Sequence, residues 1–133
     1  MAALATNILV RFLVEDDTAK LVAARKLIRR CIAAGETLFV PVTVALELEW
    51  VLRSGFGFDK PSVVQTLSQL LSSVELSFES ESALEVALAL CGQGTADFSN
   101  ALQVALACAA DESPLWTFDR AAARLDGAQL MKT

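Results

Sequence analysis

Short apolar segments alternate with helical patterns along the whole chain, and this alternation constrains the fold more than any other feature. Segments of this length and composition are typical of β-strands, and the residues between them recur at helical spacing. Strands that alternate with helices pair in parallel, because each crossover helix returns the chain to the same end of the sheet. The sequence therefore predicts an α/β domain with a central, mostly parallel sheet flanked by helices. The five predicted strands are residues 2–5, 37–40, 74–78, 115–118 and 128–131.

The length of 133 residues and the 54% of hydrophobic residues suffice for one domain with a single core, residues 1–133. No apolar run is long enough to cross a membrane. No basic stretch precedes the N-terminal apolar run, and Arg11 interrupts that run, so we expect no signal peptide. With a net charge of −5, a basic patch alone will not hold nucleic acid, and a divalent cation would have to supply positive charge.

The chain has no histidine, which excludes Ser-His-Asp and Cys-His catalysis as well as histidine-ligated zinc. Its three cysteines, Cys31, Cys91 and Cys108, do not have metal-ligand spacing. Each lies in an apolar, helix-like stretch, so we expect free, buried thiols in a reducing cytoplasm. Any catalysis must then come from carboxylates, lysines or hydroxyls.

Two aspartates lie where an α/β sheet forms its site. Asp119 directly follows the strand-like residues 115–118, and sites form at the carboxyl ends of parallel strands. Asp97 begins a helix that is apolar nearly all round, so it points into or beside the core. Each aspartate also fits a purely structural interpretation as a helix N-cap. The two roles are compatible, because a capping carboxylate keeps free lone pairs.

Two glutamates share the helix predicted after residue 43, and helical geometry separates them. At 100° per residue from Val44, Glu47 falls on the flank of the apolar face and Glu49 falls off it. A carboxylate beside the core is costly unless it is paired or metal-bound, so Glu47 is the candidate ligand. We expect Glu49 to be a solvated or interface charge. Leu46 and Trp50 form a second apolar strip, which indicates a surface for a partner.

Glu47, Asp97 and Asp119 could thus converge at one edge of the sheet as catalytic and metal-binding residues. Oxygen ligands without histidine suit Mg²⁺ or Mn²⁺. Two carboxylates about 5 Å apart repel each other by about 3 kcal/mol at an effective dielectric constant of about 20. Such a cluster is tolerated mainly because a divalent ion binds it.

Four blocks of the sequence, in this order, resemble the signature blocks of PIN-domain ribonucleases, specifically the VapC toxins of bacterial toxin–antitoxin pairs. The resemblance runs from the first predicted strand to about residue 124, which is almost the whole chain. The blocks are ATNILVRFLVEDD, PVTVALELEWVLRS, ADFSNALQVALA and WTFDR.

The resemblance implies a PIN-like three-layer domain with an acidic Mg²⁺ site and endoribonuclease activity on structured RNA such as tRNA or rRNA. It also implies a homodimer and a cognate, VapB-like antitoxin whose C-terminal segment covers the site. Glu47 matches the helix glutamate of the family, and Asp119 matches the acid after the late strand. The implied mechanism uses one or two Mg²⁺ ions to bind the scissile phosphate and activate water, without a side-chain base.

Two positions depart from the family pattern. The first block of the family typically reads DTN, and here it reads Ala5-Thr6-Asn7, so Ala5 resembles a lost metal ligand. The third block often reads DFxDA, and here Asp97 is kept while the second acid is Asn100, whose carbonyl oxygen could still coordinate weakly. A weakened or inactive toxin is therefore expected. Ala5 fits deliberate inactivation of a toxic enzyme better than natural loss, whereas Asn100 fits a natural change.

Two other functions stay open. A PIN-like domain that has lost its metal could act only as an interaction module that binds an antitoxin or a second copy. A carboxylate-nucleophile hydrolase acting on small molecules is a third class, and the absence of a D-x-D pattern after the first strand counts against it. The RNA target and the identity of the antitoxin do not follow from the sequence.

Overall fold

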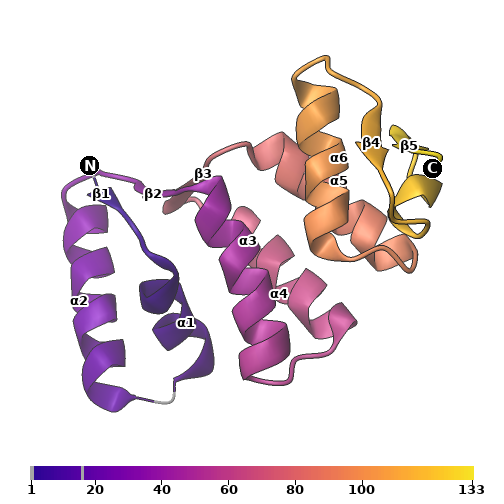
Figure 1. Cartoon of the computed structure of the whole chain (residues 1–133). Helices are drawn as coiled ribbons and strands as arrows, with labels where there is room; N and C mark the ends of the chain where they lie inside the picture. Colours follow the sequence, from indigo (N-terminus) through magenta and orange to yellow (C-terminus); the bar gives the residue numbers. More distant parts are fainter. Residues whose placement is uncertain (1, 16) are drawn as a thin grey trace. The chain divides into compact units, whose positions relative to one another are not determined.

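A computed structural model of the chain describes residues 2–15 and 17–133. The chain divides into two compact units, an N-terminal unit of Met1–Glu79 and a C-terminal unit of Ser80–Thr133. Each unit has its own helices and its own parallel strands (Figure 1). We describe each unit by itself, and the predicted single domain over residues 1–133 stays a prediction.

The N-terminal unit is built on three parallel strands in the order β1, β2, β3. The strands are β1 (Ala2–Ala3), β2 (Leu38–Val40) and β3 (Leu76–Phe78). Ala2 pairs with Leu38, and Phe39 pairs with Ser77. Two helices lie between β1 and β2, and two lie between β2 and β3, as parallel pairing requires.

Two of the four α-helices of this unit begin at a capping aspartate, and the other two follow Ala5 and Pro41. The helices are α1 (Thr6–Val14), α2 (Thr18–Ala33), α3 (Val42–Trp50) and α4 (Lys60–Leu71), with the π-helix η1 (Val51–Gly55) continuing α3. Asp17 accepts a hydrogen bond from Lys20 N at 3.1 Å, and Asp59 accepts one from Ser62 N at 2.9 Å. Both are N-caps, as the sequence predicts. Asp16, predicted with Asp17 to start α2, lies outside the described residues.

The core of the N-terminal unit lies between its sheet and its helices. Leu38 and Val40 of β2 are fully buried, whereas Phe39 between them is 38% exposed, so the sheet packs one of its faces on this core. The buried side chains include Leu4, Leu9, Val10, Leu38, Val40, Leu48, Leu52, Val63, Leu67 and Phe78.

The C-terminal unit is a helical hairpin with a two-stranded parallel sheet. Its elements are α5 (Glu81–Gln93), α6 (Phe98–Ala109), β4 (Leu115–Thr117), the 3₁₀ turn η2 (Ala122–Arg124) and β5 (Ala128–Leu130). Small residues let α5 and α6 pack closely; the buried ones are Ala83, Ala87, Ala101 and Ala105. Trp116, in the middle of β4, is 61% exposed.

Gly127 makes the turn into β5 possible. Its φ of +97° lies in the region that favours glycine, and a Cβ there would stand 3.2 Å from Val104 Cγ1. The turn therefore brings the backbone close to α6.

The predicted α/β class is confirmed, and every predicted strand contains an observed one. Two smaller predictions are wrong. The pattern Ser82-x-x-Glu85 predicts a capping box, but α5 begins at Glu81 after Ser80, whose side chain makes no cap hydrogen bond. Cys31 and Cys91 are buried free thiols as expected, but Cys108 is exposed. It lies on the same face of α6 as the buried Ala101 and Val104, but in the last turn of the helix. Within the described residues, no helix is long and apolar enough to span a membrane.

Candidate active site

The three strands of the N-terminal unit end at one edge of their sheet, and Ala5 lies there. Leu4 N donates a hydrogen bond to Phe39 O at 2.9 Å, and Glu79 N donates one to Val40 O at 2.9 Å. These bonds carry the ladder one residue beyond each strand. Ala5 and Glu79 therefore follow β1 and β3 at the carboxyl edge, where α/β sheets form their sites.

Ala5 is the N-cap residue of α1, but its side chain cannot cap. Its backbone has φ −78° and ψ 162°, and Ile8 N donates to Ala5 O at 3.2 Å. Asp97, the N-cap of α6, has φ −78° and ψ 163°. Position 5 therefore already has the backbone conformation of a capping aspartate, and lacks only the carboxylate.

Glu79 is an acid of this edge that the sequence interpretation missed. Its Oε1 accepts a hydrogen bond from Val42 N at 2.8 Å, so the carboxylate caps α3 from outside the helix. The signal that could have found it is its position directly after a strand, which is the reason for choosing Asp119. The contact itself joins segments 37 residues apart and is not readable from local sequence.

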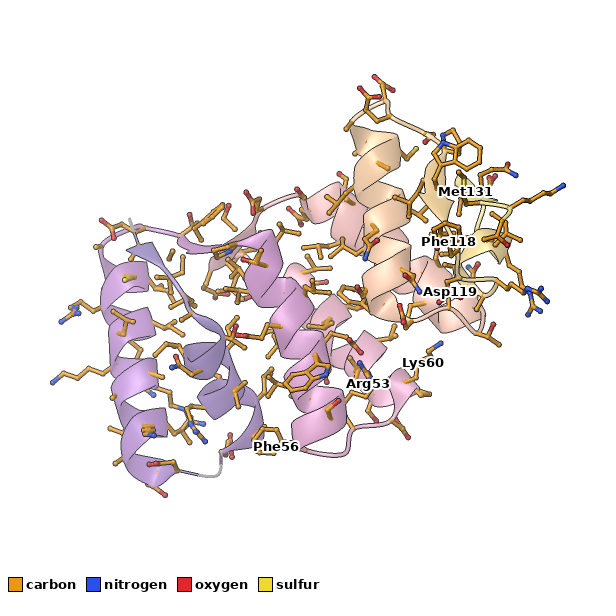
Figure 2. All side chains as sticks on the ribbon, in the orientation of Figure 1. Arg53, Phe56, Lys60, Phe118, Asp119 and Met131 are labelled. Carbon is orange, nitrogen blue, oxygen red and sulfur yellow. The ribbon has the colours of Figure 1, made fainter. Side chains whose placement is uncertain are left out.

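The expected exposure of the two α3 glutamates is reversed. Glu47 is exposed and has no hydrogen bond or ion pair with a described residue. Glu49 is only 7% exposed, and its Oε2 accepts from Arg53 Nε at 2.8 Å, with a longer contact from Nη2 at 3.4 Å. The prediction of a solvated Glu49 is wrong, and Glu47 does not lie beside the core of its unit. Arg53 lies in η1, the π-helical continuation of α3 (Figure 2).

The two exposures are reversed because the helix buries Ala45 more completely than Val44, the residue from which the helical angles are counted. Ala45, Leu48 and Leu52 are the buried residues of this helix and its π-helical continuation, whereas Val44 is only half-buried. With Ala45 included, the centre of the buried face moves by about 75° from Val44, toward Glu49. Glu49 then lies at the border of the core, where only its pairing with Arg53 makes burial tolerable.

The second apolar strip of α3 is present as an exposed feature. Trp50 is 58% exposed, and Leu46 is half-buried. An exposed indole next to a leucine is an apolar surface that a partner could cover. The assignment of this strip to a partner stays a prediction.

In the C-terminal unit, Asp97 caps α6 as the structural interpretation predicts. Its Oδ1 accepts a hydrogen bond from Asn100 N at 2.8 Å. No residue that the structure describes forms a hydrogen bond with Oδ2 of Asp97, so this oxygen keeps its lone pairs. The side chain of Asn100 is half-buried, one turn further along the helix.

Asp119 also uses one oxygen as a cap. Its Oδ1 accepts from Ala121 N at 2.8 Å and from Ala122 N at 3.2 Å, and its own N donates to Thr117 Oγ1 at 3.0 Å. Figure 2 shows Asp119 just beyond Phe118. These bonds fix the carboxylate at the end of β4, and its second oxygen has no hydrogen bond with the described part of the chain.

Asp97 and Asp119 lie at the same end of their unit. The strand β4 runs back alongside α6, so the end of β4 returns toward the start of α6 (Figure 1). Glu47 belongs to the N-terminal unit, and its convergence with the two aspartates stays a prediction.

Comparison with known families decides the classification. The family model described as PIN domain matches residues 3–128. The chain belongs to the PIN domain family. PIN domains are commonly Mg²⁺-dependent nucleases, and the matched range covers most of both units and includes all the candidate residues. Searches of curated proteins and of solved structures found no significant match.

The predicted ligand atoms of this PIN domain are of the type that a hard divalent cation binds, but they are few. The predicted ligands offer only oxygen atoms, and both aspartates keep a free one, which suits Mg²⁺. Ala5 offers no donor, and the amide of Asn100 offers no charge. Among the described residues, no three acids, cysteines or histidines form a group that could hold a metal ion. The residues therefore fit the ion in chemistry, and the missing carboxylate at position 5 weakens the set.

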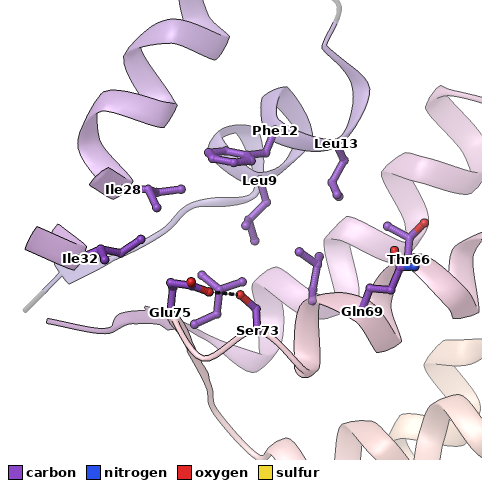
Figure 3. A pocket seen from close by; sticks show the side chains of 11 residues that line it. Leu9, Phe12, Leu13, Ile28, Ile32, Thr66, Gln69, Ser73 and Glu75 are labelled. Carbon is purple, nitrogen blue, oxygen red and sulfur yellow. Dashed lines mark hydrogen bonds between the residues drawn. The ribbon is translucent and has the colours of Figure 1, made fainter. Parts of the chain in front are cut away.

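The N-terminal unit of this PIN domain has a second feature that the sequence interpretation missed, an apolar hollow of about 400 Å³. Leu9 of α1, Ile28 of α2 and Leu70 of α4 line it, with Glu75 at its side (Figure 3). The hydroxyl of Ser73 donates to Glu75 Oε2 at 2.5 Å and, as the largest cause, lowers the pKa of that carboxyl. Glu75 is therefore an ionised carboxylate beside an apolar surface.

Proposed function

We propose that the active form of this chain is a divalent-metal-dependent endoribonuclease toxin of a toxin–antitoxin pair, and that Ala5 weakens or inactivates the present form. The observation that carries the proposal is at position 5. Ala5 lies at the carboxyl edge of its sheet with the backbone of a capping aspartate. The VapC-like blocks have an acid at this position, and the backbone here could present a carboxylate where this chain has a methyl group.

Glu47, Asp97 and Asp119 would hold the ion, with a weak contribution from the carbonyl oxygen of Asn100. When bound, Mg²⁺ or Mn²⁺ would supply positive charge for the scissile phosphate of a structured RNA, of the tRNA or rRNA class, and an activated water. Asp97 and Asp119 are positioned in the absence of substrate, because backbone amides donate hydrogen bonds to one oxygen of each carboxylate. This restraint leaves the other oxygen preorganised for an ion.

We also propose that a VapB-like antitoxin and a second copy of the chain are its partners. Two observations support apolar contacts of this kind: the exposed strip with Leu46 and Trp50, and the hollow beside Glu75. An amphipathic antitoxin segment would put apolar side chains into the hollow and a lysine or arginine near Glu75. Sedimentation of a strict monomer at micromolar concentration would count against the homodimer.

The alternative function is a PIN-like interaction module without a metal. What favours it is the absence of a group of three ligands among the described residues, together with the methyl group at position 5. This module would bind an antitoxin and cut no RNA, whatever acid is restored.

Ala5→Asp tests the two functions against each other, with Ala5→Asn as the matched control. Both variants place a capping oxygen at the start of α1, but only aspartate adds a charge for a metal ion. We expect Ala5→Asp to cleave RNA with Mg²⁺ and to stop with a chelator, whereas Ala5→Asn and the present chain cleave little. An Ala5→Asp protein that is folded and cuts no RNA would overturn the nuclease proposal in favour of the interaction module.

A further inference from the structure

The helix α2 is strongly cationic although the whole chain is acidic. Its sequence, TAKLVAARKLIRRCIA, holds five of the chain's eleven lysines and arginines and no acidic residue. The net charge of the chain is −5. Positive charge is therefore concentrated on one element, which the net charge conceals.

Four of these cations lie on one side of the helix. Arg25, Lys26, Arg29 and Arg30 are all exposed, and we call this set the cationic stripe. At 100° per residue they fall within a sector of about 140°. The side chains that α2 buries lie on its opposite side, and they are Leu21, Ala24 and Cys31. The stripe thus faces away from the core of its own unit.

The stripe has almost no partners. Only Arg25 forms an ion pair, with Glu15 at 3.2 Å, and both side chains of this pair are largely in solvent. Lys26, Arg29 and Arg30 make no ion pair or hydrogen bond with any residue that the structure describes. Like charges four residues apart repel each other along a helix, as Arg25 and Arg29 do. The stripe therefore opposes helix stability, and among the described residues only the exposed ion pair of Arg25 with Glu15 offsets this repulsion.

We propose that the cationic stripe binds the phosphate backbone of RNA, an inference that rests on the proposed ribonuclease function. Side chains four residues apart on a helix stand about 5–6 Å from each other, so the stripe offers two rows of cations over two turns. Three of its four members are arginines, whose guanidinium groups bind phosphate oxygens in pairs. Phosphate contacts position RNA without reading its sequence. We assign this positioning to the stripe, which lies outside the acidic site.

RNA binding by a variant and a matched control tests the stripe. Lys26→Gln with Arg29→Gln removes two charges from it, and Arg124→Gln with Lys132→Gln removes two exposed charges from the C-terminal unit. Binding of fluorescently labelled tRNA is followed by anisotropy between about 50 and 200 mM salt. A chelator is present throughout, so that no cleavage interferes.

We expect the stripe variant to bind more weakly than the control. A plot of log affinity against log salt has a negative slope, and the magnitude of this slope should decrease by about 1.4 to 1.8. Each of the two lost phosphate contacts accounts for about 0.7 to 0.9 of that decrease. An unrelated hairpin RNA should be affected equally, because the contact carries no sequence information. The melting temperature of the stripe variant should not fall, because its substitutions reduce repulsion within α2.

Equal loss in the two variants would overturn the inference, because affinity would then follow net charge. Unchanged tRNA binding by the stripe variant would overturn it as well, and would leave a solvated face or a surface for an acidic protein segment. Cleavage by Ala5→Asp is the separate readout for the nuclease. If Ala5→Asp cleaves normally with the stripe neutralised, the stripe inference fails alone. If no variant cleaves but binding depends on the stripe, the nuclease proposal fails alone.

Discussion

The starts of α1 and α6 have the same backbone and different chemistry. Both N-cap residues have φ −78°, with ψ 162° at Ala5 and 163° at Asp97. At α6 a carboxylate accepts from the amide three residues on, and at α1 the backbone oxygen of Ala5 accepts instead, at 3.2 Å. The conformation of a cap therefore does not depend on the capping side chain. An acid can be lost at position 5 without disturbing the edge of the sheet that holds it.

The N-cap of α4, Asp59, shows that capping geometry by itself does not identify a site residue. Asp59 begins α4 with φ −76° and ψ 167°, and it accepts from Ser62 N at 2.9 Å, yet it follows a loop and not a strand. Capping geometry alone thus marks a helix start. Position after a strand distinguishes Ala5 and Asp119 from Asp59, and Asp97 differs from Asp59 by lying at the same end of its unit as Asp119.

The largest effect should separate site aspartates from merely structural ones. In the Ala5→Asp background, we expect Asp97→Asn and Asp119→Asn each to lower RNA cleavage by roughly 10²-fold or more, because each removes a charge placed for the reaction. Asp59→Asn is the matched control, since asparagine caps nearly as well as aspartate in all three places. Initial rates on one labelled RNA measure the effect. Equal losses in all three variants would break the distinction.

The next effect concerns Mg²⁺ and stability. With the acid restored, an ion that binds only the folded chain should raise the free energy of unfolding by about 2.7 kcal/mol at 100 times its dissociation constant. The present chain and Ala5→Asn should gain much less. Urea unfolding with Mg²⁺ and with a chelator measures the difference. If all three proteins respond alike, position 5 is not a ligand position.

A smaller, reciprocal effect tests the shared cap geometry itself. Ala5→Asn should stabilise the chain by about 1 kcal/mol, and Asp97→Ala should destabilise it by about 1 kcal/mol, because one gains and the other loses a cap hydrogen bond. Ala5→Asp without metal should gain less than Ala5→Asn if the other carboxylates lie close, since about 3 kcal/mol of repulsion acts at about 5 Å before screening. Chemical unfolding in a chelator gives all three values.

The smallest effect lies in acid. Hydrogen bonds from Ser62 and Ser73 lower the pKa of Asp59 and of Glu75 below their ordinary values of 3.8 and 4.5. A carboxyl with a lowered pKa stabilises the fold above its unfolded pKa, and this contribution is lost as pH falls through the folded pKa. Glu75→Gln should therefore lower the melting temperature slightly at neutral pH and flatten its further loss below about pH 4.5. If the melting temperature of Glu75→Gln depends on pH below about 4.5 in the same way as that of the present chain, the role of the Ser73 hydroxyl is contradicted.

Local patterns predicted the fold well because they depend on neighbours in the chain. The five strand positions follow from apolar runs between breakers, and the caps at Asp17 and Asp59 follow from a polar residue before a helical pattern. The PIN family was likewise readable, since its blocks are contiguous stretches.

Features that depend on packing were the ones missed. The burial of Glu49 turns on whether Ala45 or Val44 faces the core, which two adjacent small apolar residues do not reveal. The cap that Glu79 gives to α3 joins distant segments, and the exposure of Cys108 depends on where α5 stops covering α6. For the site, the individual positions of Asp97 and Asp119 followed from sequence, whereas their convergence with Glu47 depends on the assembled fold and stays a prediction.

The chain's two tryptophans are divided between its units, and this makes each unit optically distinct. Trp50 on α3 is 58% exposed and Trp116 in β4 is 61% exposed, so both indoles emit from a largely aqueous environment. Replacing Trp116 with phenylalanine leaves a single fluorophore on the strip with Leu46, and replacing Trp50 leaves one in the C-terminal unit. Emission and quenching of the two single-tryptophan proteins would therefore report, unit by unit, which surface becomes covered when a binding protein arrives.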